Sequence, residues 1–344
     1  MLKTINITLF WAFLLLPLTI PGQEDVPQAD DPQKSFFNYL VKQKINRIKL
    51  STEIDTMVAK KMQAGEFEGY ISFIDTLGVS HTLSADFEVR GKFRRKNCQF
   101  PPINIDLKKG QLLALGLSDY DSYKLVTHCS EGRSSEDVLN KEYIAYKIYN
   151  LLTPESFRVH LLEIEYNDLS GNYSTIKKAF FIESNKELED RLEGEYCECL
   201  GQSPDSIDAF KYELMSMFHY MIGNRDVDLL VLHNIKLLRP KNGGLMTVVA
   251  WDFDFSKFVY APYAHSSTDP NYRLARIYLG YPQNRHVLPE VIQVFKSKEE
   301  RINEYIKNYE DLSNSARVDA LRYLRYFYKD IERRDGNMEY IYLK

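Results

Sequence analysis

The sequence predicts an α+β protein of two lobes: a mainly antiparallel β lobe with one helix, then a mainly helical lobe. Two observations favour this division. Between residues 45 and 183, apolar and polar residues mostly alternate, which is the period of half-buried strands. From residue 184 onward, apolar residues recur mainly every three or four positions, as on one face of a helix. A chain of 344 residues is long enough for both lobes.

The N-terminus has the pattern of a secretory signal. A single positive charge, Lys3, precedes an apolar run from Ile5 to Ile20, and the small residue Gly22 follows. This run is short for a membrane span of about 20 residues. We therefore expect a cleaved signal peptide over residues 1–22, a secreted or periplasmic protein, and no stable membrane span after cleavage. An uncleaved anchor is the alternative. Residues 23–44 are expected to form a polar spacer.

Composition excludes few functions. Charged residues make up 27% of the chain and hydrophobic residues 44%, which is ordinary for a globular protein. A formal net charge of -4 gives no overall reason to expect nucleic-acid binding. One basic cluster stands out, formed by Arg90, Lys92, Arg94, Arg95 and Lys96. It is either a solvated face or a surface that faces phosphate.

Four cysteines occur in the chain. In an oxidising compartment an even number favours pairing, and a bridge between Cys98 and Cys129 would join two adjacent strands. Cys197 and Cys199 are separated by one residue, so a bridge between them would be strained. A thiolate metal site there would need two more ligands. The pairing stays open at this point.

The elements of the first lobe follow from periodicity. A Ser134 N-cap, acidic residues in the first turn and Pro154 beyond the end define its long helix. A shorter helical pattern covers residues 52–62. The expected strands cover residues 45–50, 69–74, 82–93, 103–107, 123–128, 157–166 and 174–183.

The second lobe, residues 184–344, is expected to be mainly helical. Two short strands, 235–238 and 245–250, interrupt the helices. The expected helices cover residues 186–192, 205–222, 288–298, 299–309 and 313–334.

Four oxygen-bearing residues stand at the ends of these expected elements. Asp226 and Asn234 lie at the two ends of one loop, and Asp252 and Asp254 follow the strand 245–250. If that strand continues through Asp254, the period of two places both carboxylates on one face. Carboxylates so close together repel each other, so a divalent metal is a natural occupant. An Asp and an Asn on one loop, followed by two further carboxylates, is the order that phosphotransferases use.

The order N-x-D, H-N and W-D-F-D, at residues 224–226, 233–234 and 251–254, resembles the CotH-like (spore-coat protein H) family of atypical kinases from exported bacterial proteins. The similarity covers roughly residues 45–263. It implies a two-lobed, atypical protein-kinase-like fold that binds ATP with Mg²⁺ or Mn²⁺.

The resemblance also implies residue roles. Asp226, rather than Asp228, would orient the acceptor hydroxyl, and Asn234, Asp252 and Asp254 would bind the metal. His233 is expected to brace the loop.

Kinases of this broad type pair a strand lysine with a helix glutamate. Lys124 and Glu142 are the candidates, and two unrelated surface residues are the alternative. No glycine-rich phosphate loop is visible, so Arg90 and Lys92 compete with Lys124 as phosphate ligands.

The resulting hypothesis is an exported kinase that transfers phosphate from ATP to a protein or other hydroxyl acceptor. The alternative is a non-catalytic, pseudokinase-like binding module for an anionic glycan or a protein partner, which would use the basic cluster. A hydrolase with Asp252 and Asp254 as its carboxylate pair is a third, weaker hypothesis.

Overall fold

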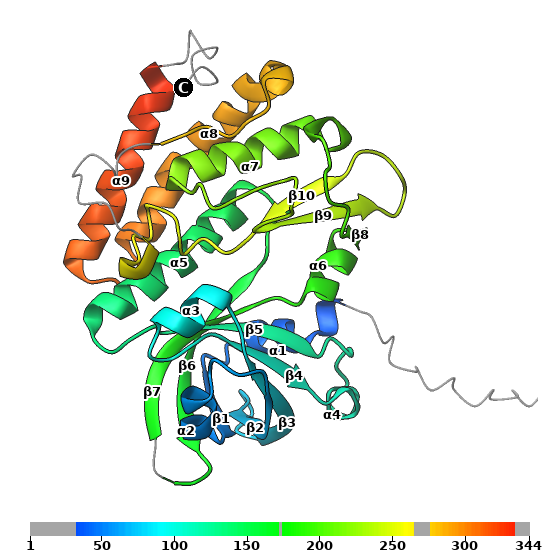
Figure 1. The fold of residues 1–344 in the computed structure, drawn as a ribbon, viewed down its shortest axis with the longest axis vertical. Helices are drawn as coiled ribbons and strands as arrows, with labels where there is room; N and C mark the ends of the chain where they lie inside the picture. The colour runs from blue at the N-terminus through cyan, green and yellow to red at the C-terminus, as the bar shows by residue number, and fades with distance from the viewer. Residues whose placement is uncertain (1–31, 172–173, 265–275, 334–344) are drawn as a thin grey trace, which may run out of the picture.

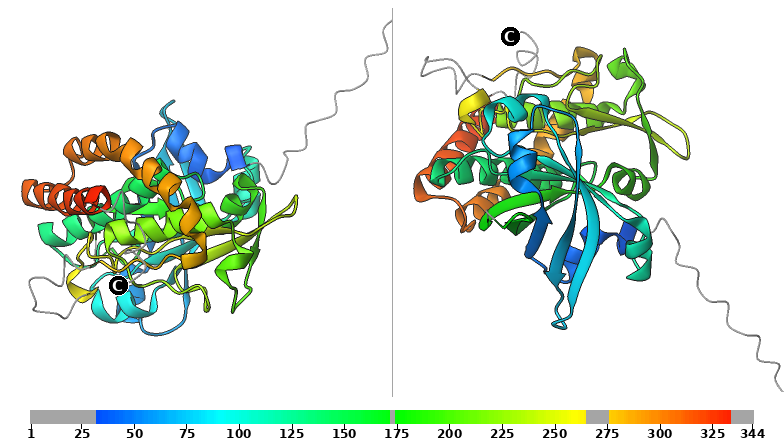
Figure 2. Two further views of the ribbon diagram at one scale, coloured as in Figure 1. Left: turned by 90° about the horizontal axis from the view of Figure 1, so that it is seen from above. Right: turned by 60° about the horizontal axis from the view of Figure 1, so that its bottom comes forward.

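The computed structural model describes residues 32–171, 174–264 and 276–333. Its first half is a closed barrel with the strand order β1-β2-β3-β4-β5-β7-β6, at the bottom of Figure 1. The view with the bottom turned forward shows these strands projecting below the helices (Figure 2). The barrel strands are β1 (Arg47–Thr52), β2 (Glu66–Ile74), β3 (Ser80–Val89), β4 (Ile103–Leu107), β5 (Ser122–Thr127), β6 (Val159–Asp168) and β7 (Ser174–Ile182).

Alternation along the strands fills the barrel. In β4, Ile103, Ile105 and Leu107 are buried, whereas Asn104 and Asp106 between them are half-buried. Successive side chains of a strand point to opposite faces, so the apolar set forms the barrel core and the polar set faces outward.

The barrel closes through a parallel pair, and this overturns the expected fold class. Strand β1 pairs with β2 in the antiparallel sense but with β6 in the parallel sense, with Arg47 opposite Glu163 and Thr52 opposite Asp168. The prediction of a two-lobed kinase-like fold with a mainly antiparallel first lobe is therefore wrong. The parallel pair joins segments more than 100 residues apart, and no local periodicity specifies which distant strand will close a sheet.

The second half packs a small sheet and long helices around a separate core. The sheet has the order β10-β9-β8, and α5 runs between the barrel and the other long helices (Figure 1). The helices are amphipathic: in α8, buried residues such as Leu288, Val291, Ile292 and Phe295 follow the helical period. The elements are β8 (Gly194–Cys197), β9 (Ile235–Pro240), β10 (Thr247–Ala250), α5 (Arg133–Leu152), α7 (Ala209–Ile222), α8 (Leu288–Lys307) and α9 (Asn314–Arg333).

Short helices connect the strands. They are α1 (Phe36–Lys42), α2 (Ile54–Ala59), α3 (Lys92–Asn97), α4 (Lys109–Ala114) and α6 (Asn185–Arg191), with 3-10 turns at Pro32–Lys34, Pro204–Ser206, Pro262–Ala264 and Pro282–Val287.

Several boundaries differ from those expected, and three of the differences change an element. Helix α1 lies inside the segment expected to be a spacer, because Ser35 caps it and Phe36 and Phe37 are buried. Strand β3 ends at Val89, well before residue 93, because Gly91 turns the chain with a φ of 80°. The two helices expected at 288–298 and 299–309 are one helix, α8.

Two disulfides are present, and they resolve the pairing. Cys98, at the end of α3, is bonded to Cys129, just after β5. The bridge thus joins α3 to the end of a barrel strand. Cys197 is bonded to Cys199.

The expected signal peptide, residues 1–22, lies outside the described residues. In the part of the chain that is described, no helix combines the length and the apolar character that crossing a membrane requires.

A buried ionic cluster fastens α1 and α6 to the barrel. Glu187 is fully buried and accepts hydrogen bonds from Ser35 Oγ and from Arg158 Nη2, each at 2.6 Å. Arg158 also pairs with the buried Glu183. Burial and, to a lesser extent, the charge of Glu183 raise the pKa of Glu187 to about 7.

This cluster predicts how stability varies with pH. The pKa of Glu187 is higher in the folded protein than its ordinary value of 4.5. Its stabilising contribution is therefore complete below that value and is lost as the pH rises toward 7. Relative to Glu187→Gln, the wild-type free energy of unfolding should fall by roughly 3 kcal/mol across this interval. Urea denaturation at several pH values measures the difference. The exposed control Glu195→Gln should show none, and an equal slope in all three proteins would contradict the assignment.

Candidate functional site

Buried side chains hold the loop that follows α7. Gly223 ends the helix in the left-handed conformation, with a φ of 63°. Asn224 is fully buried, its side chain contacts His219 Nδ1 at 3.3 Å, and its Oδ1 accepts the Asp226 backbone N–H at 3.1 Å. The backbone of Asp226 is thus held by a buried amide, as a residue that orients a substrate requires.

Both carboxylate oxygens of Asp226 have partners at the surface. One oxygen lies 2.9 Å from His233 Nε2, and the other accepts Asn234 Nδ2–H at 3.0 Å. The side chains of Asp226 and His233 are 35% and 51% exposed, so this pair faces solvent. His233 thus contacts Asp226 across the loop, on the side that is open to solvent.

Asn234 connects this loop to the second motif. Its backbone carbonyl accepts the Trp251 N–H at 3.1 Å, at the end of the β9–β10 ladder. Strand β10 ends at Ala250, and Asp252 has a φ of 63°. The strand thus does not continue through Asp254. The alternation of side chains expected along a strand therefore does not determine where the two carboxylates lie. A left-handed turn at Asp252 places them instead.

The half-buried Asp252 nevertheless interacts with the buried charged groups of Asp254, Glu142 and Arg94. Asp254 is buried and accepts the Tyr263 hydroxyl at 2.9 Å. Burial raises the pKa of Asp254 well above its ordinary range, and the charges of Asp252 and Glu142 add to this effect. Since like charges in close proximity raise each other's pKa, the structure brings together the carboxylates that the motif contains.

Arg94 is the cation of this cluster. It is buried, its Nη1 lies 3.4 Å from Glu142 Oε2, and its Nη2 donates to the Thr127 carbonyl at 2.8 Å. Burial raises the pKa of Glu142 to about 7 although Arg94 opposes this shift. Burial has the larger effect, and the charge of Asp252 acts in the same direction as burial.

The expected Lys124–Glu142 pair is not formed. Lys124 Nζ donates to Asn185 Oδ1 at 3.1 Å, and Glu142 takes Arg94 as its partner. The physical reason is the turn at Gly91, which starts helix α3 and directs Arg94 inward while Lys92 stays exposed. Lys92 therefore does not join the buried cluster.

Three cations instead surround the indole ring of Trp251. The side-chain charges of Arg90, Lys124 and Lys236 lie 5.9, 5.8 and 5.7 Å from its centroid. Burial and, to a lesser extent, the charges of Arg90 and Lys236 lower the pKa of Lys124 to about 7. The positive charges repel each other. A polyanionic ligand bound between them would reduce this repulsion.

Sequence reasoning missed Arg94 as the partner of Glu142, and it did not select Lys236, Tyr146 or Tyr263. Gly91 was an available signal, since a glycine at the end of a strand indicates a turn. A turn there would have separated the inward Arg94 from the outward Lys92. Tyr146 and Tyr263 gave no comparable signal, because in sequence they read as core aromatics.

The side chains of Asn234, Asp252 and Asp254 carry oxygen donors, the ligand type that hard divalent cations prefer. Asp252 and Asp254 offer carboxylates, and Asn234 uses its Nδ2 toward Asp226, which leaves its Oδ1 as an acceptor. Within the described ranges, no group of three or more His, Cys, Asp or Glu side chains is arranged to hold a metal. A cation here would therefore need further oxygens from its ligand, as Mg²⁺ does when it is bound with a nucleotide.

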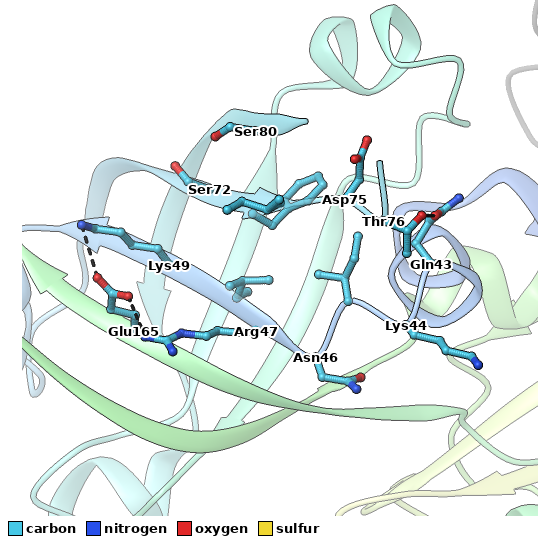
Figure 3. A pocket seen from close by; sticks show the side chains of 14 residues that line it. Gln43, Lys44, Asn46, Arg47, Lys49, Ser72, Asp75, Thr76, Ser80 and Glu165 are labelled. Atoms are coloured by element: carbon cyan, nitrogen blue, oxygen red, sulfur yellow. Dashed lines mark hydrogen bonds and ion pairs between the residues drawn. The ribbon is translucent and has the colours of Figure 1, made fainter. Parts of the chain in front are cut away.

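A separate cavity of about 550 Å³ opens on the barrel between β1 and β2 (Figure 3). Its lining includes Ile45, Ile48 and Phe73, with Arg47 and Lys49 on β1 near Glu165 of β6. The site residues discussed above do not line it. The charged cluster and this cavity are therefore distinct features.

Neither the known protein-family models nor the curated proteins include a match to this chain. The site is therefore interpreted from its own geometry.

Proposed function

We propose that this chain is a metal-dependent phosphotransferase that binds ATP and transfers its terminal phosphate to a hydroxyl group of a protein or another acceptor. One observation carries the proposal: three cations lie around Trp251, and the charge of the next residue, Asp252, acts both on one of them, Lys124, and on Asp254. A polyphosphate needs the cations, and the metal ion that accompanies it needs the carboxylates.

The cations have a clear task in this proposal. Arg90, Lys124 and Lys236 would hold phosphate oxygens, and Lys124 would gain its full charge when the polyanion binds. They replace the glycine-rich loop that the sequence lacks. Asn234, Asp252 and Asp254 would hold Mg²⁺ or Mn²⁺, which neutralises charge on the phosphates when it is bound.

Asp226 would orient the acceptor hydroxyl and accept its proton. Its backbone is fixed by Asn224, and its carboxylate is held by His233 and Asn234 at the exposed edge of the site. In phosphotransferases of this kind one aspartate both positions the attacking hydroxyl and accepts its proton. The fixed and exposed Asp226 suits that task.

The proposal depends on side chains and their charges, and it does not require a kinase fold. Membership of the CotH-like family remains a prediction from the motif order. Secretion or a periplasmic location likewise remains a prediction from residues 1–22.

Trp251 provides a direct test. The chain contains two tryptophans, Trp11 and Trp251, so a Trp11→Phe protein reports only on the site. Titration with ATP in the presence of Mg²⁺ or Mn²⁺ should change the fluorescence of Trp251 to saturation. The absence of any saturable change with either metal would overturn the proposal.

Asp252→Asn should remove the metal-dependent part of this binding. The substitution keeps a residue type that tolerates the left-handed conformation and removes one ligand charge. In wild type, ATP with Mn²⁺ at a hundredfold excess over its dissociation constant should raise the free energy of unfolding by about 2.7 kcal/mol. In the variant, ATP should give the same small effect with and without Mn²⁺. Thermal denaturation measures both effects, with Asp86→Asn on the barrel as the control. A full Mn²⁺-dependent increase in Asp252→Asn would contradict the metal assignment.

A second candidate is the non-catalytic module for an anionic partner. It is favoured by the fact that both oxygens of Asp226 already have partners. It predicts metal-independent binding of an anionic polymer that weakens with salt and disappears when Lys124 and Lys236 are changed to glutamate. Metal-dependent turnover of ATP would exclude it.

A further inference from the structure

We propose that Tyr146 is a positioning residue: its hydroxyl holds the backbone of Asp252 in the conformation that directs the Asp252 carboxylate into the site. This inference rests on the proposed function and adds a residue that no motif indicated. Tyr146 does not itself touch the proposed ligand.

The contact is specific. The Asp252 N–H donates to the Tyr146 hydroxyl oxygen at 2.8 Å, and Tyr146 is only 1% exposed. Asp252 is among the few non-glycine residues described with a positive φ. A left-handed residue of this kind persists only where its surroundings hold it. The neighbouring charges of Asp252 and Glu142, together with burial, raise the pKa of Tyr146, so the hydroxyl stays neutral.

Tyr146 lies on helix α5 together with Glu142. Glu142, one helical turn earlier, pairs with Arg94, and Tyr146 packs on Phe253 with ring centroids 4.6 Å apart. One rigid helix thus sets both the ion pair and the orientation of Asp252.

The same helix offers a matched control. Tyr149, one turn further along α5, is also 1% exposed, and its ring stacks on Phe218 with centroids 4.4 Å apart. It packs in the same core, but none of the hydrogen bonds among the described residues joins its hydroxyl to Asp252. Tyr146→Phe and Tyr149→Phe remove one buried hydroxyl each, but only the first acts on a predicted ligand.

The experiment is a titration of both variants with ATP in Mn²⁺ and in EDTA, followed by Trp251 fluorescence. Loss of one net hydrogen bond should weaken ATP binding in Mn²⁺ by about three- to tenfold in Tyr146→Phe. Binding in EDTA should change less than about twofold, because the cations around Trp251 are untouched. Tyr149→Phe should bind as wild type does under both conditions.

Other outcomes are possible, and each would contradict the role of Tyr146, the proposed function or both. Equal losses in Mn²⁺ and EDTA, or equal losses in the two variants, would show a general packing role and overturn the inference. Wild-type affinity in Tyr146→Phe would also overturn it while the proposed function stands. A wild-type protein that binds no ATP in either solution would overturn both.

Discussion

Asp226→Asn should bind ATP with Mn²⁺ as tightly as wild type and yet transfer its terminal phosphate about 10²–10⁴ times more slowly. The side chain keeps its size and its contacts with His233 and Asn234, but it loses the negative charge that accepts the proton of the hydroxyl. Binding is unaffected because the cations and the carboxylates near Trp251 remain. The measurement is the initial rate at which labelled phosphate leaves ATP, to water or to any hydroxyl, at saturating ATP.

Asp228→Asn is the matched control for this prediction. Asp228 lies two residues away on the same loop, is exposed, and accepts the Leu230 N–H at 2.8 Å. Its loss should change the rate less than about threefold, since an exposed local hydrogen bond contributes little. A normal rate in Asp226→Asn, or a large loss in Asp228→Asn, would show that the other aspartate orients the hydroxyl.

Local elements were predictable because they depend on local periodicity. The strand expected at 103–107 forms at those residues, and the long helix ends before Pro154 as expected. The expected Ser134 N-cap was wrong, because the helix begins at Arg133 after Gly132. The closure of the barrel was not predictable in this way, because β1 and β6 pair across more than 100 residues. This parallel pair is the difference between the observed closed barrel and the expected antiparallel lobe.

The site shows the same limit at the level of single residues. The motif order singled out Asp226, Asn234, Asp252 and Asp254, and the structure connects the two segments through the Trp251–Asn234 bond. The partner of Glu142 could not be read from the strand pattern, because the chain leaves the strand at Gly91. A period-two argument fails wherever a residue with positive φ intervenes, as at Gly91 and again at Asp252.

The buried Arg94–Glu142 pair leads to the second large prediction, which concerns stability. Arg94→Met removes the cation from a pocket that also contains the carboxylates of Asp252 and Asp254. Breaking a buried ion pair by removing one partner costs about 3–5 kcal/mol, because the other charge is left without compensation. The free energy of unfolding at pH 7, measured in urea, should fall by this amount. Lys96→Met, an exposed change on the same helix α3, should change it by less than about 0.5 kcal/mol.

A double-mutant cycle separates the ion pair from the packing of the long side chains. Arg94→Met combined with Glu142→Met replaces both charges by apolar groups of similar length, which is often nearly neutral for buried pairs. The double variant should therefore be more stable than Arg94→Met alone, with a coupling energy of about 1–3 kcal/mol. Additive losses would mean that Arg94 acts mainly through its hydrogen bond to the Thr127 carbonyl and its contact with the Tyr263 ring. In that case α3 would be fastened to the barrel by packing, and the carboxylates would reach charge balance by retaining a proton.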